Sequence, residues 1–416
     1  MKRIISHIIL KTKTPLKVGS NKIDFVQDSP IQRDWNNLPM ILGTSIAGVV
    51  RKEFNEKIAS DIFGENQGSK IIFSNALLLD ENNQVNEKLL INKSDFLQIF
   101  DELPIRQHTA ITDKGVTREH SKFDEEIVFK GSRFKFLVEF VDLDEEIFEK
   151  VIEKIVSKTF RLGGGSTKGF GEFEVEKITY EEFDENSYSD ISTSLNTTLK
   201  NEYQIKSYLE NYDEYILKLT PDNFFMFGSG FGDEDSDMTA VFENEIDYQN
   251  KTLSKKRVLI PASSIKGAIS HRLAFNWNIE NNDFEDTAKI EEENEAVITI
   301  FGHKKEKKDD IELGQKGKIL ISDCYINKYN EKKFEHVKID RFTGGASDGA
   351  LFQEKTTQSD KFEIRLYLKS SVEEKYKKVF EKTLKEICNG LLPLGGMTTK
   401  GHGFFSGELY KNGEEI

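Results

Sequence analysis

Two glycine-rich segments carry residues suited to binding phosphate groups. They occupy residues 163–171 (GGGSTKGFG) and 395–403 (GGMTTKGHG). Glycine adopts positive φ and lets the backbone approach a ligand closely. Exposed backbone N–H groups suit phosphates, and Lys168 and Lys400 add positive charge. Neither segment is a nucleotide-binding fingerprint, because each precedes a predicted strand rather than a helix. A simple chain turn remains the alternative for each.

Each glycine-rich segment is the last of three motifs that occur twice in the same order. The first set is LGTSIAG at 42–48, IFG at 62–64 and the first glycine-rich segment. The second set is IPASSIKG at 260–267, IFG at 300–302 and the second glycine-rich segment. This period far exceeds that of solenoid or propeller repeats. The order therefore predicts a duplicated domain, and two tandem copies usually act on one extended ligand.

The elements that would position these motifs follow one plan in both copies. Residues 4–12, 70–78, 133–140 and 171–178 have strand character, and 45–58 and 143–158 have helical period. The second copy predicts strands at 215–220, 318–326, 361–368 and 403–410, and helices at 264–275 and 372–389. Serines at 45 and 264 are predicted to cap their helices. The order β, α, β, β, α, β is that of a ferredoxin-like unit.

The predicted fold class is therefore α+β, with two tandem ferredoxin-like (RRM-like) domains. The domains are predicted at residues 1–180 and 207–416, joined by a linker at 181–206 that is rich in Ser, Asn, Thr, Asp and Glu. Polar insertions at 278–295 and 303–317 are predicted to be mobile surface loops.

Composition limits the class of protein. The 416 residues carry a net charge of −14, which argues against indiscriminate nucleic-acid binding. Basic runs at 251–257 and 304–308 could still form a local groove, or could simply be solvated loops. Two cysteines support neither a disulfide framework nor a four-ligand zinc site, so we expect a cytoplasmic protein. No apolar run approaches the roughly 20 residues of a membrane span, so we expect no membrane partner.

The motif set resembles the RAMP superfamily of CRISPR-associated RNA-binding proteins. The resemblance is closest to backbone subunits of type III effector complexes, which carry a segment similar to IDRFTGGA at 339–346 followed by LFQE at 351–354. A looser version in the first copy reads HTAITD at 108–113 and FDEE at 123–126. Two fused copies are similar to the type III-D variant. The resemblance also implies thumb-like hairpins, within 106–126 and 337–357.

The resemblance implies a subunit that binds CRISPR RNA beside other RAMP-type subunits and cleaves a complementary, single-stranded target RNA. The cleaving residue of the family is an aspartate in a loop after the first strand, which Asp28 matches within QDSPI at 27–31. A carboxylate can take a proton from the RNA 2′-hydroxyl or position a divalent ion, Mg²⁺ or Mn²⁺. Asp28 would then be catalytic and a metal ligand. A turn-capping aspartate before Ser-Pro is the alternative.

The counterpart of Asp28 in the second copy is Asp237, when DMTA at 237–240 is aligned on DSPI at 28–31. This alignment lacks the proline and needs an insertion before Pro261. Asp235 and Asp247 are therefore kept as alternatives. Asp237 would share the catalytic role and the metal-binding role of Asp28.

Further residues are candidates for binding the RNA backbone. Cations suit phosphates, helix starts can accept phosphate oxygens, and the glycines expose backbone N–H groups, although solvated surface charge is an equally good account of each cation. The candidates are Ser45, Arg51, Gly163, Gly164, Gly165, Lys168, Ser264, Lys266, Arg272, Arg341, Gly395, Gly396 and Lys400.

Two other functions are compatible with the same sequence. A structural subunit that binds CRISPR RNA without cleaving would keep the fold and the glycine-rich segments. An endonuclease that processes precursor CRISPR RNA would commonly depend on histidine, with His7 or His108 as its candidate. The aspartate-containing loop at 27–31 counts against that second alternative.

Overall fold

The computed structural model describes residues 2–20, 30–65, 67–112, 116–283, 294–308 and 311–416. The candidate Asp28 lies outside the described residues, as does most of the insertion predicted at 278–295. Within the described part of the chain, no helix combines the length and apolar character needed to cross a membrane.

The N-terminal half (residues 2–206) is built on strand β1 (Arg3–Thr12), which lies between β7 (Arg133–Val141) and β8 (Phe173–Phe183). Both neighbours run antiparallel to β1. Ile4, Ile5 and Ile8 of β1 are buried, so the strand is the centre of this half's core. The remaining strands of the sheet are β2 (Met40–Ile41), β3 (Ile71–Phe73), β4 (Ala76–Leu78) and β9 (Asn201–Glu202).

The C-terminal half (residues 207–416) repeats this sheet. Strand β10 (Tyr212–Pro221) lies between β21 (Phe362–Lys369) and β22 (Phe405–Lys411), again antiparallel to both. β17 (Ile319–Ile321) pairs with β21 as β3 pairs with β7. β23 (Glu414–Glu415) extends the edge at β22. The two halves thus share the order of five strands, from β3 or β17 to β9 or β23, whereas β2 and β4 have no counterpart in the C-terminal sheet. The predicted α+β class is confirmed.

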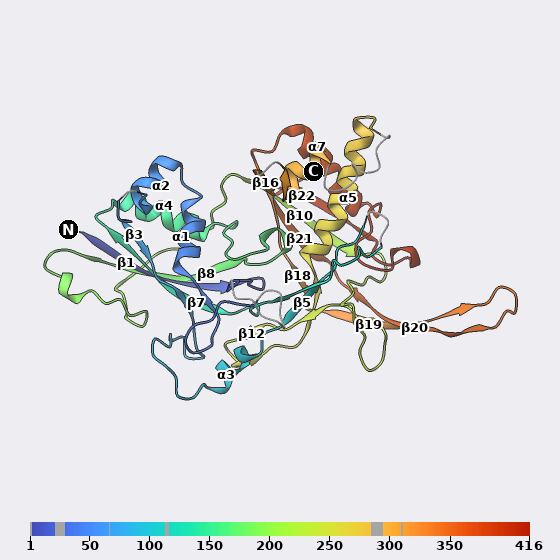
Figure 1. Ribbon diagram of the computed structural model, residues 1–416, viewed down its shortest axis with the longest axis horizontal. Helices are drawn as coiled ribbons and strands as arrows, with labels where there is room; N and C mark the ends of the chain where they lie inside the picture. The colour runs from blue at the N-terminus through green and yellow to red at the C-terminus, as the bar shows by residue number, and fades with distance from the viewer. Residues whose placement is uncertain (1, 21–29, 66, 113–115, 284–293, 309–310) are drawn as a thin grey trace.

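The helices bury apolar side chains in the two cores. In the N-terminal half they are α1 (Gly43–Arg51), α2 (Glu56–Phe63), α3 (Asp95–Gln98) and α4 (Glu145–Val156). In the C-terminal half they are α5 (Ala262–Glu280), α6 (Glu295–Phe301) and α7 (Glu374–Cys388). Figure 1 shows α5 and α7 together on the C-terminal sheet.

The predicted serine caps are wrong. The N-cap residues of α1 and α5 are Leu42 and Pro261, and neither makes a side-chain cap hydrogen bond. Instead, a side-chain oxygen from the strand region accepts a hydrogen bond from the first N–H of each helix. Asn75 Oδ1 accepts from the N–H of Gly43 at 2.9 Å, and Asp323 Oδ1 from that of Ala262 at 2.8 Å. The single helix predicted at 45–58 is also wrong, because the chain breaks it into α1 and α2.

Hairpins fill the connections between the shared strands. The short arm is the pair β5 (Ile105–His108) and β6 (Phe123–Glu126), and the long arm is β19 (Tyr329–Ile339) and β20 (Ala346–Ser359). The long arm projects away from the body of the protein (Figure 1). A third hairpin, β15 (Gly302–Lys308) and β16 (Ile311–Lys316), replaces the loop predicted at 303–317.

The segment predicted as a linker packs on the N-terminal half over much of its length. β8 continues to Phe183, and β9 pairs with it at Thr179 and Tyr180. Leu195 and Leu199 are buried in the N-terminal core. The domain boundary at 181–206 stays a prediction, but its polar composition does not make the segment free of contacts.

The two halves meet through a buried group of charges. The Arg106 guanidinium on the short arm pairs with Asp323, at 2.8 Å from Nη1 to Oδ2, and with Glu243. The Asp323 side chain is fully buried. Asp323 follows β17, and Glu243 lies on β11 (Phe242–Glu243), which pairs with β14 (Arg257–Ile260), itself paired with β18 (Cys324–Ile326). We call Arg106, Glu243 and Asp323 the junction cluster.

A small hairpin from the C-terminal half enters the other core beside the junction cluster. It consists of β12 (Ile246–Asp247) and β13 (Thr252–Leu253). The Tyr248 hydroxyl donates to the Leu79 carbonyl at 3.0 Å and accepts from the Arg133 N–H at 3.1 Å. Ile246 and Tyr248 belong to the N-terminal hydrophobic core. The two halves are therefore interlocked by both apolar packing and ion pairs.

Replacing Arg106 should destabilise the junction strongly. Arg106→Leu leaves Asp323 and Glu243 buried without their cation, a change that typically costs about 3–5 kcal/mol. Urea unfolding followed by circular dichroism should show this loss of unfolding free energy. Lys361→Leu is the control, because Lys361 pairs with Glu408 at an exposed site and should cost less than about 1 kcal/mol. Equal losses in the two variants would contradict the role given to the junction cluster.

His7 should make the fold sensitive to mild acid. It lies buried within β1, and burial with the nearby Lys135 charge lowers its pKa to about 4. The unfolded chain binds a proton near pH 6.5, so unfolding becomes easier as pH falls from about 6.5 to 4. The total contribution is about 3 kcal/mol at pH 4. Unfolding free energies of His7→Leu across this range should fall less steeply than those of the parent, and identical slopes would refute the assignment.

Candidate functional site

The two glycine-rich segments have the same backbone geometry. Each contains a short 3₁₀ turn, η2 (Ser166–Lys168) and η5 (Thr398–Lys400). Gly163 and Gly395 open the segments at φ values of 82° and 94°. A Cβ on Gly163 would lie 2.2 Å from the Lys17 carbonyl oxygen, so only glycine fits there. The duplicated sequence therefore encodes a duplicated loop, held against the strand region that follows β1 or β10.

In the N-terminal half, the glycine-rich segment faces the short arm. Lys168 Nζ lies 4.7 Å from the centroid of the Phe123 ring. The His108 ring stacks on the same Phe123 ring, with 5.1 Å between the two centroids. His108 Nε2 lies 3.1 Å from a buried oxygen of Glu125, whose other oxygen contacts Lys17. Burial alone would raise the pKa of Glu125, but the contacts with His108 and Lys17 outweigh it and lower the pKa to about 2.

The C-terminal half repeats this arrangement on the long arm. Lys400 Nζ lies 5.0 Å from the centroid of Phe352, and His336 stacks on Phe352 at 6.0 Å. His336 Nε2 lies 2.9 Å from Oε1 of Glu354, which is fully buried. His402 stands in the second glycine-rich segment where the first has Phe170, and its Nε2 lies 3.1 Å from the same Glu354 oxygen. We call each set of lysine, phenylalanine, histidine and glutamate a loop–arm cluster.

The chain segments that carry the candidate aspartates also correspond in register. The N–H of Gln32 donates to the Val18 carbonyl at 2.7 Å, and that of Val241 to the Phe227 carbonyl at 2.8 Å. Ile31 and Ala240 form equivalent bridges with Gly19 and Gly228. Counting back three sequence positions from Ile31 and Ala240 gives Asp28 and Asp237.

The second-half candidates differ in their surroundings. Asp237 is exposed, and its Oδ2 accepts from the Gln353 N–H on the long arm at 2.8 Å. Asp235 pairs with Lys355 at 3.2 Å. Asp247 lies on β12, where it accepts from Gln249 and Asn250 within its own turn. The structure thus brings Asp235 and Asp237 to the long arm and places Asp247 on the β12–β13 hairpin, between two residues of the N-terminal core.

Two candidate lysines converge where the first glycine-rich segment meets α5. Lys266 Nζ lies 3.4 Å from Thr167 Oγ1. Burial, together with the neighbouring charge of Lys168, lowers the pKa of Lys266. Ser264 is exposed in the first turn of α5. This basic site is composite, because Lys168 comes from one half and Lys266 and Ser264 from the other.

Four other candidates for binding the RNA backbone lie away from the two glycine-rich segments. Arg51 donates to the Gly64 carbonyl at 3.2 Å, next to α2. Arg272 donates to the Leu391 carbonyl at 3.0 Å, on the C-terminal body. Arg341 lies in the exposed turn at the tip of the long arm. Ser45 is half-buried in the first turn of α1. These four do not join the loop–arm clusters.

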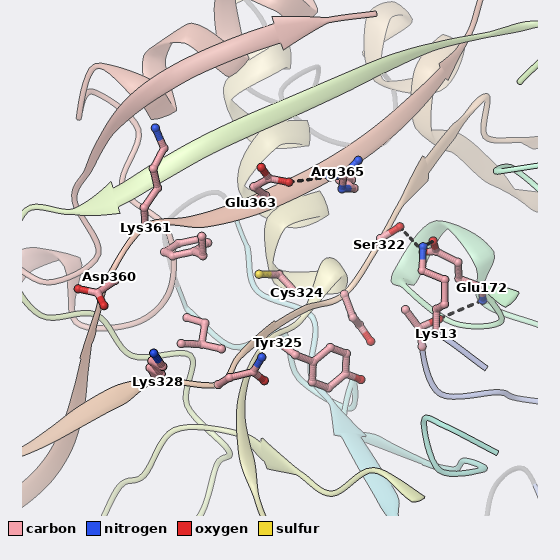
Figure 2. A pocket seen from close by; sticks show the side chains of 15 residues that line it. Lys13, Glu172, Ser322, Cys324, Tyr325, Lys328, Asp360, Lys361, Glu363 and Arg365 are labelled. Carbon is pink, nitrogen blue, oxygen red and sulfur yellow. Dashed lines mark hydrogen bonds and ion pairs between the residues drawn. The ribbon is translucent and has the colours of Figure 1, made fainter. Parts of the chain in front are cut away.

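A hollow of about 590 Å³ lies at the junction of the halves (Figure 2). Its cations are largely matched by acids: Lys13 lies 2.9 Å from Glu172, and Arg365 lies 2.6 Å from Glu363. Burial raises the pKa of the Cys324 thiol there to about 12, so it stays protonated. These paired charges and this inert thiol favour a structural role for the hollow over phosphate binding.

The loop aspartates do not belong to a preformed metal site. Among the described residues, no group of three or more His, Cys, Asp or Glu side chains is placed to share an ion. Asp237 nevertheless offers an exposed carboxylate. Mg²⁺ commonly keeps several waters and takes one or two carboxylates together with substrate phosphates. A single loop aspartate therefore fits an ion bound jointly with RNA.

Sequence reasoning missed the buried glutamates of the loop–arm clusters. Glu125 and Glu354 stand in the duplicated motifs FDEE at 123–126 and LFQE at 351–354, yet neither was assigned a role. Their signal was the shared spacing Phe-x-Glu, with a histidine on the preceding strand. The pairing of His108 with Phe123 and of His336 with Phe352 depends on hairpin register. The two hairpins differ greatly in length. The number of residues between histidine and phenylalanine therefore does not reveal that the two side chains face each other in both halves.

Comparison with known proteins agrees with the duplication. The sequence profile of the RAMP superfamily matches residues 9–174 and again 240–406. No curated protein matches the chain. A solved chain from the "Cryo-EM structure of the Type III-B Cmr-beta bound to cognate target RNA" is 21% identical with a TM-score of 0.32. That match covers 43% of this chain and 61% of the solved chain, under two thirds of its length. Because the profile matches most of the chain in two regions, this protein belongs to the RAMP superfamily and contains the family's domain twice.

Proposed function

We propose that the protein is a backbone subunit of a type III CRISPR-Cas effector complex. It binds CRISPR RNA, lies beside other RAMP-type subunits and cleaves a complementary, single-stranded target RNA. Each half is proposed to be a ferredoxin-like (RRM-like) domain that handles one stretch of the RNA, and the fusion resembles the type III-D variant. The observation that carries this proposal is the duplicated loop–arm cluster beside an equivalent aspartate-bearing segment.

The loop–arm clusters support a role in holding a nucleic-acid backbone. The N–H groups of Gly164 and Gly396 donate within the fold to the carbonyls of Lys17 and Met226, so other N–H groups of the glycine-rich segments are proposed to meet phosphate oxygens. Lys168 and Lys400 add positive charge beside them. The net charge of −14 then favours recognition at these local sites over general attraction to nucleic acid. Lys266 extends the first site across the junction, so binding there depends on both halves.

The cleavage chemistry is proposed to rest on Asp28 and Asp237. The 2′-oxygen of RNA bonds to the adjacent phosphorus when the two are aligned, an alignment that bound geometry can supply, and the bond from phosphorus to the 5′-oxygen breaks. The departing 5′-oxygen takes a proton from water. A carboxylate next to the hydroxyl accepts its proton. A divalent cation such as Mg²⁺ or Mn²⁺, when bound, supplies positive charge that stabilises the phosphate in the transition state. One aspartate per half would give two cuts at a fixed spacing.

Experiment can distinguish this proposal from the two alternative functions, a structural subunit and a precursor-processing endonuclease. A structural subunit would bind CRISPR RNA through the same clusters and make no cut. The precursor-processing alternative is less well supported by its candidates, because His7 is buried in β1 and His108 is engaged by Phe123 and Glu125. Incubation of the protein alone with precursor CRISPR RNA would detect such processing.

Substituting the loop aspartates should remove the cuts one at a time. Asp28→Ala should abolish one cut in a complementary RNA, and Asp237→Ala the other, with losses of at least about 100-fold. Complexes assembled on CRISPR RNA would be given end-labelled target, and the products mapped by gel electrophoresis. Target binding, measured in parallel, should stay within twofold of the parent. Persistence of both cuts in the double variant would favour the structural alternative.

Alanine at Gly396 should separate RNA binding from folding. A Cβ there would lie 3.6 Å from the Met226 carbonyl oxygen, an ordinary contact, whereas one on Gly395 would lie 2.6 Å from it at a φ of 94°. Gly396→Ala should thus leave thermal stability unchanged but weaken CRISPR RNA binding several-fold if phosphate approaches this backbone. Gly395→Ala, the steric comparison, should lower both stability and binding. Parental affinity in Gly396→Ala would argue against a phosphate at this segment.

A further inference from the structure

The segments that carry the candidate aspartates are fastened to the arms by opposite charges in the two halves. In the N-terminal half, Glu126 on the short arm accepts from the Ile31 N–H at 2.8 Å and from Arg33 Nη2 at 2.9 Å. The Glu126 and Arg33 side chains are 8% and 17% exposed, so this contact is largely shielded from solvent. Here the arm supplies the anion and the loop supplies the cation.

In the C-terminal half the signs are reversed. The backbone bridge from Leu16 to Val128 in the N-terminal half is equivalent to the bridge from Phe225 to Thr357 in the C-terminal half. Glu126 and Lys355 each stand two positions before the arm residue of that bridge, so they are equivalent. Lys355 donates to the carboxylates of Asp233 and Asp235, both in the loop before Asp237. Here the arm supplies the cation and the loop supplies the anions.

The second fastening also differs in exposure. The Asp233 and Asp235 side chains are 42% and 72% exposed. The hydrogen bond from Lys355, with backbone bonds of the loop, lowers the pKa of Asp233 to about 2, so the pair stays charged at neutral pH. Backbone contacts continue the attachment: the N–H of Asp237 donates to the Gln353 carbonyl at 3.0 Å.

We propose that Lys355 is a positioning residue for the C-terminal cleavage site, which holds the loop 229–241 on the long arm through Asp233 and Asp235. This inference rests on the proposed function, because Asp237 is the group it would position. Asp233 and Asp235 are then fastening residues, and Asp237 alone faces the RNA. Reversing the arm charge should release the loop in this half and leave the other half unaffected.

The activity test uses the assembled complex and compares its two cuts. Lys355→Glu should slow the Asp237-dependent cut at least fivefold and keep the Asp28-dependent cut within twofold of the parent. Adding Asp233→Lys and Asp235→Lys to Lys355→Glu should restore the slowed cut to within about twofold. Lys382→Glu is the matched control, since Lys382 forms an exposed pair with Glu280 on the helical side, and should change neither cut. If the triple variant shows parental amide exchange in 229–241 but the cut is not restored, the proposal is overturned, because Lys355 would then act on RNA directly.

A second measurement judges the fastening without RNA. Hydrogen–deuterium exchange of the full chain should show faster exchange of amides in 229–241 in Lys355→Glu, and parental exchange in the triple variant. Unchanged exchange in Lys355→Glu would overturn the proposal whatever the activity. If Asp237→Ala leaves both cuts intact while the exchange behaves as expected, the proposed function fails at this site but the fastening role of Lys355 stands.

Discussion

The buried pairing of Arg106 with Asp323 and Glu243 fixes how the two halves sit together. Three charges are removed from water at one point, and each is stable only with its partners present. Asp323 also accepts from the first N–H of α5, so the same carboxylate sets the start of that helix. A shift of one half against the other would break the ion pairs and the helix start together. The relative placement of the halves is therefore specified, rather than left to apolar packing alone.

That placement decides what the first glycine-rich segment faces. Gly169 bridges to Ser322, and a Cβ on Gly169 would lie 2.2 Å from Asp323 Oδ1, so the loop closes directly on the junction cluster. Lys168 and Lys266 lie near each other because the first glycine-rich segment packs here against the C-terminal half. The second glycine-rich segment has similar internal geometry but lies against Met226 and Glu354, within the C-terminal half. The two loops thus have different neighbours: the first contacts both halves, and the second contacts its own half and exposes Thr399, Lys400 and Gly401.

The two arms also share a common geometry but differ in charge. Both carry a histidine stacked on a phenylalanine above a buried glutamate, which keeps arm and loop in fixed contact. The short arm supplies Glu126 at the position where the long arm supplies Lys355. The loop partners do not correspond in sequence, because Arg33 stands five positions after Asp28, whereas Asp233 and Asp235 stand four and two positions before Asp237. Both halves nevertheless join arm and loop by an ion pair, whose attraction does not depend on which side carries the positive charge.

The sequence by itself determined the duplication, the family resemblance, the α+β class and the approximate positions of the central strands, because these follow from local periodicity and motif order. It also indicated Lys168 and Lys400, which lie within their motifs. It could not indicate the helix starts, where Asn75 and Asp323 replace the expected serines, or the packing of 181–206 on the first half. Arg106 meets its partners 137 and 217 residues away, and His108 meets Glu125 only through hairpin register. Contacts of this kind arise from chain folding over long separations, so only the tertiary structure decided them.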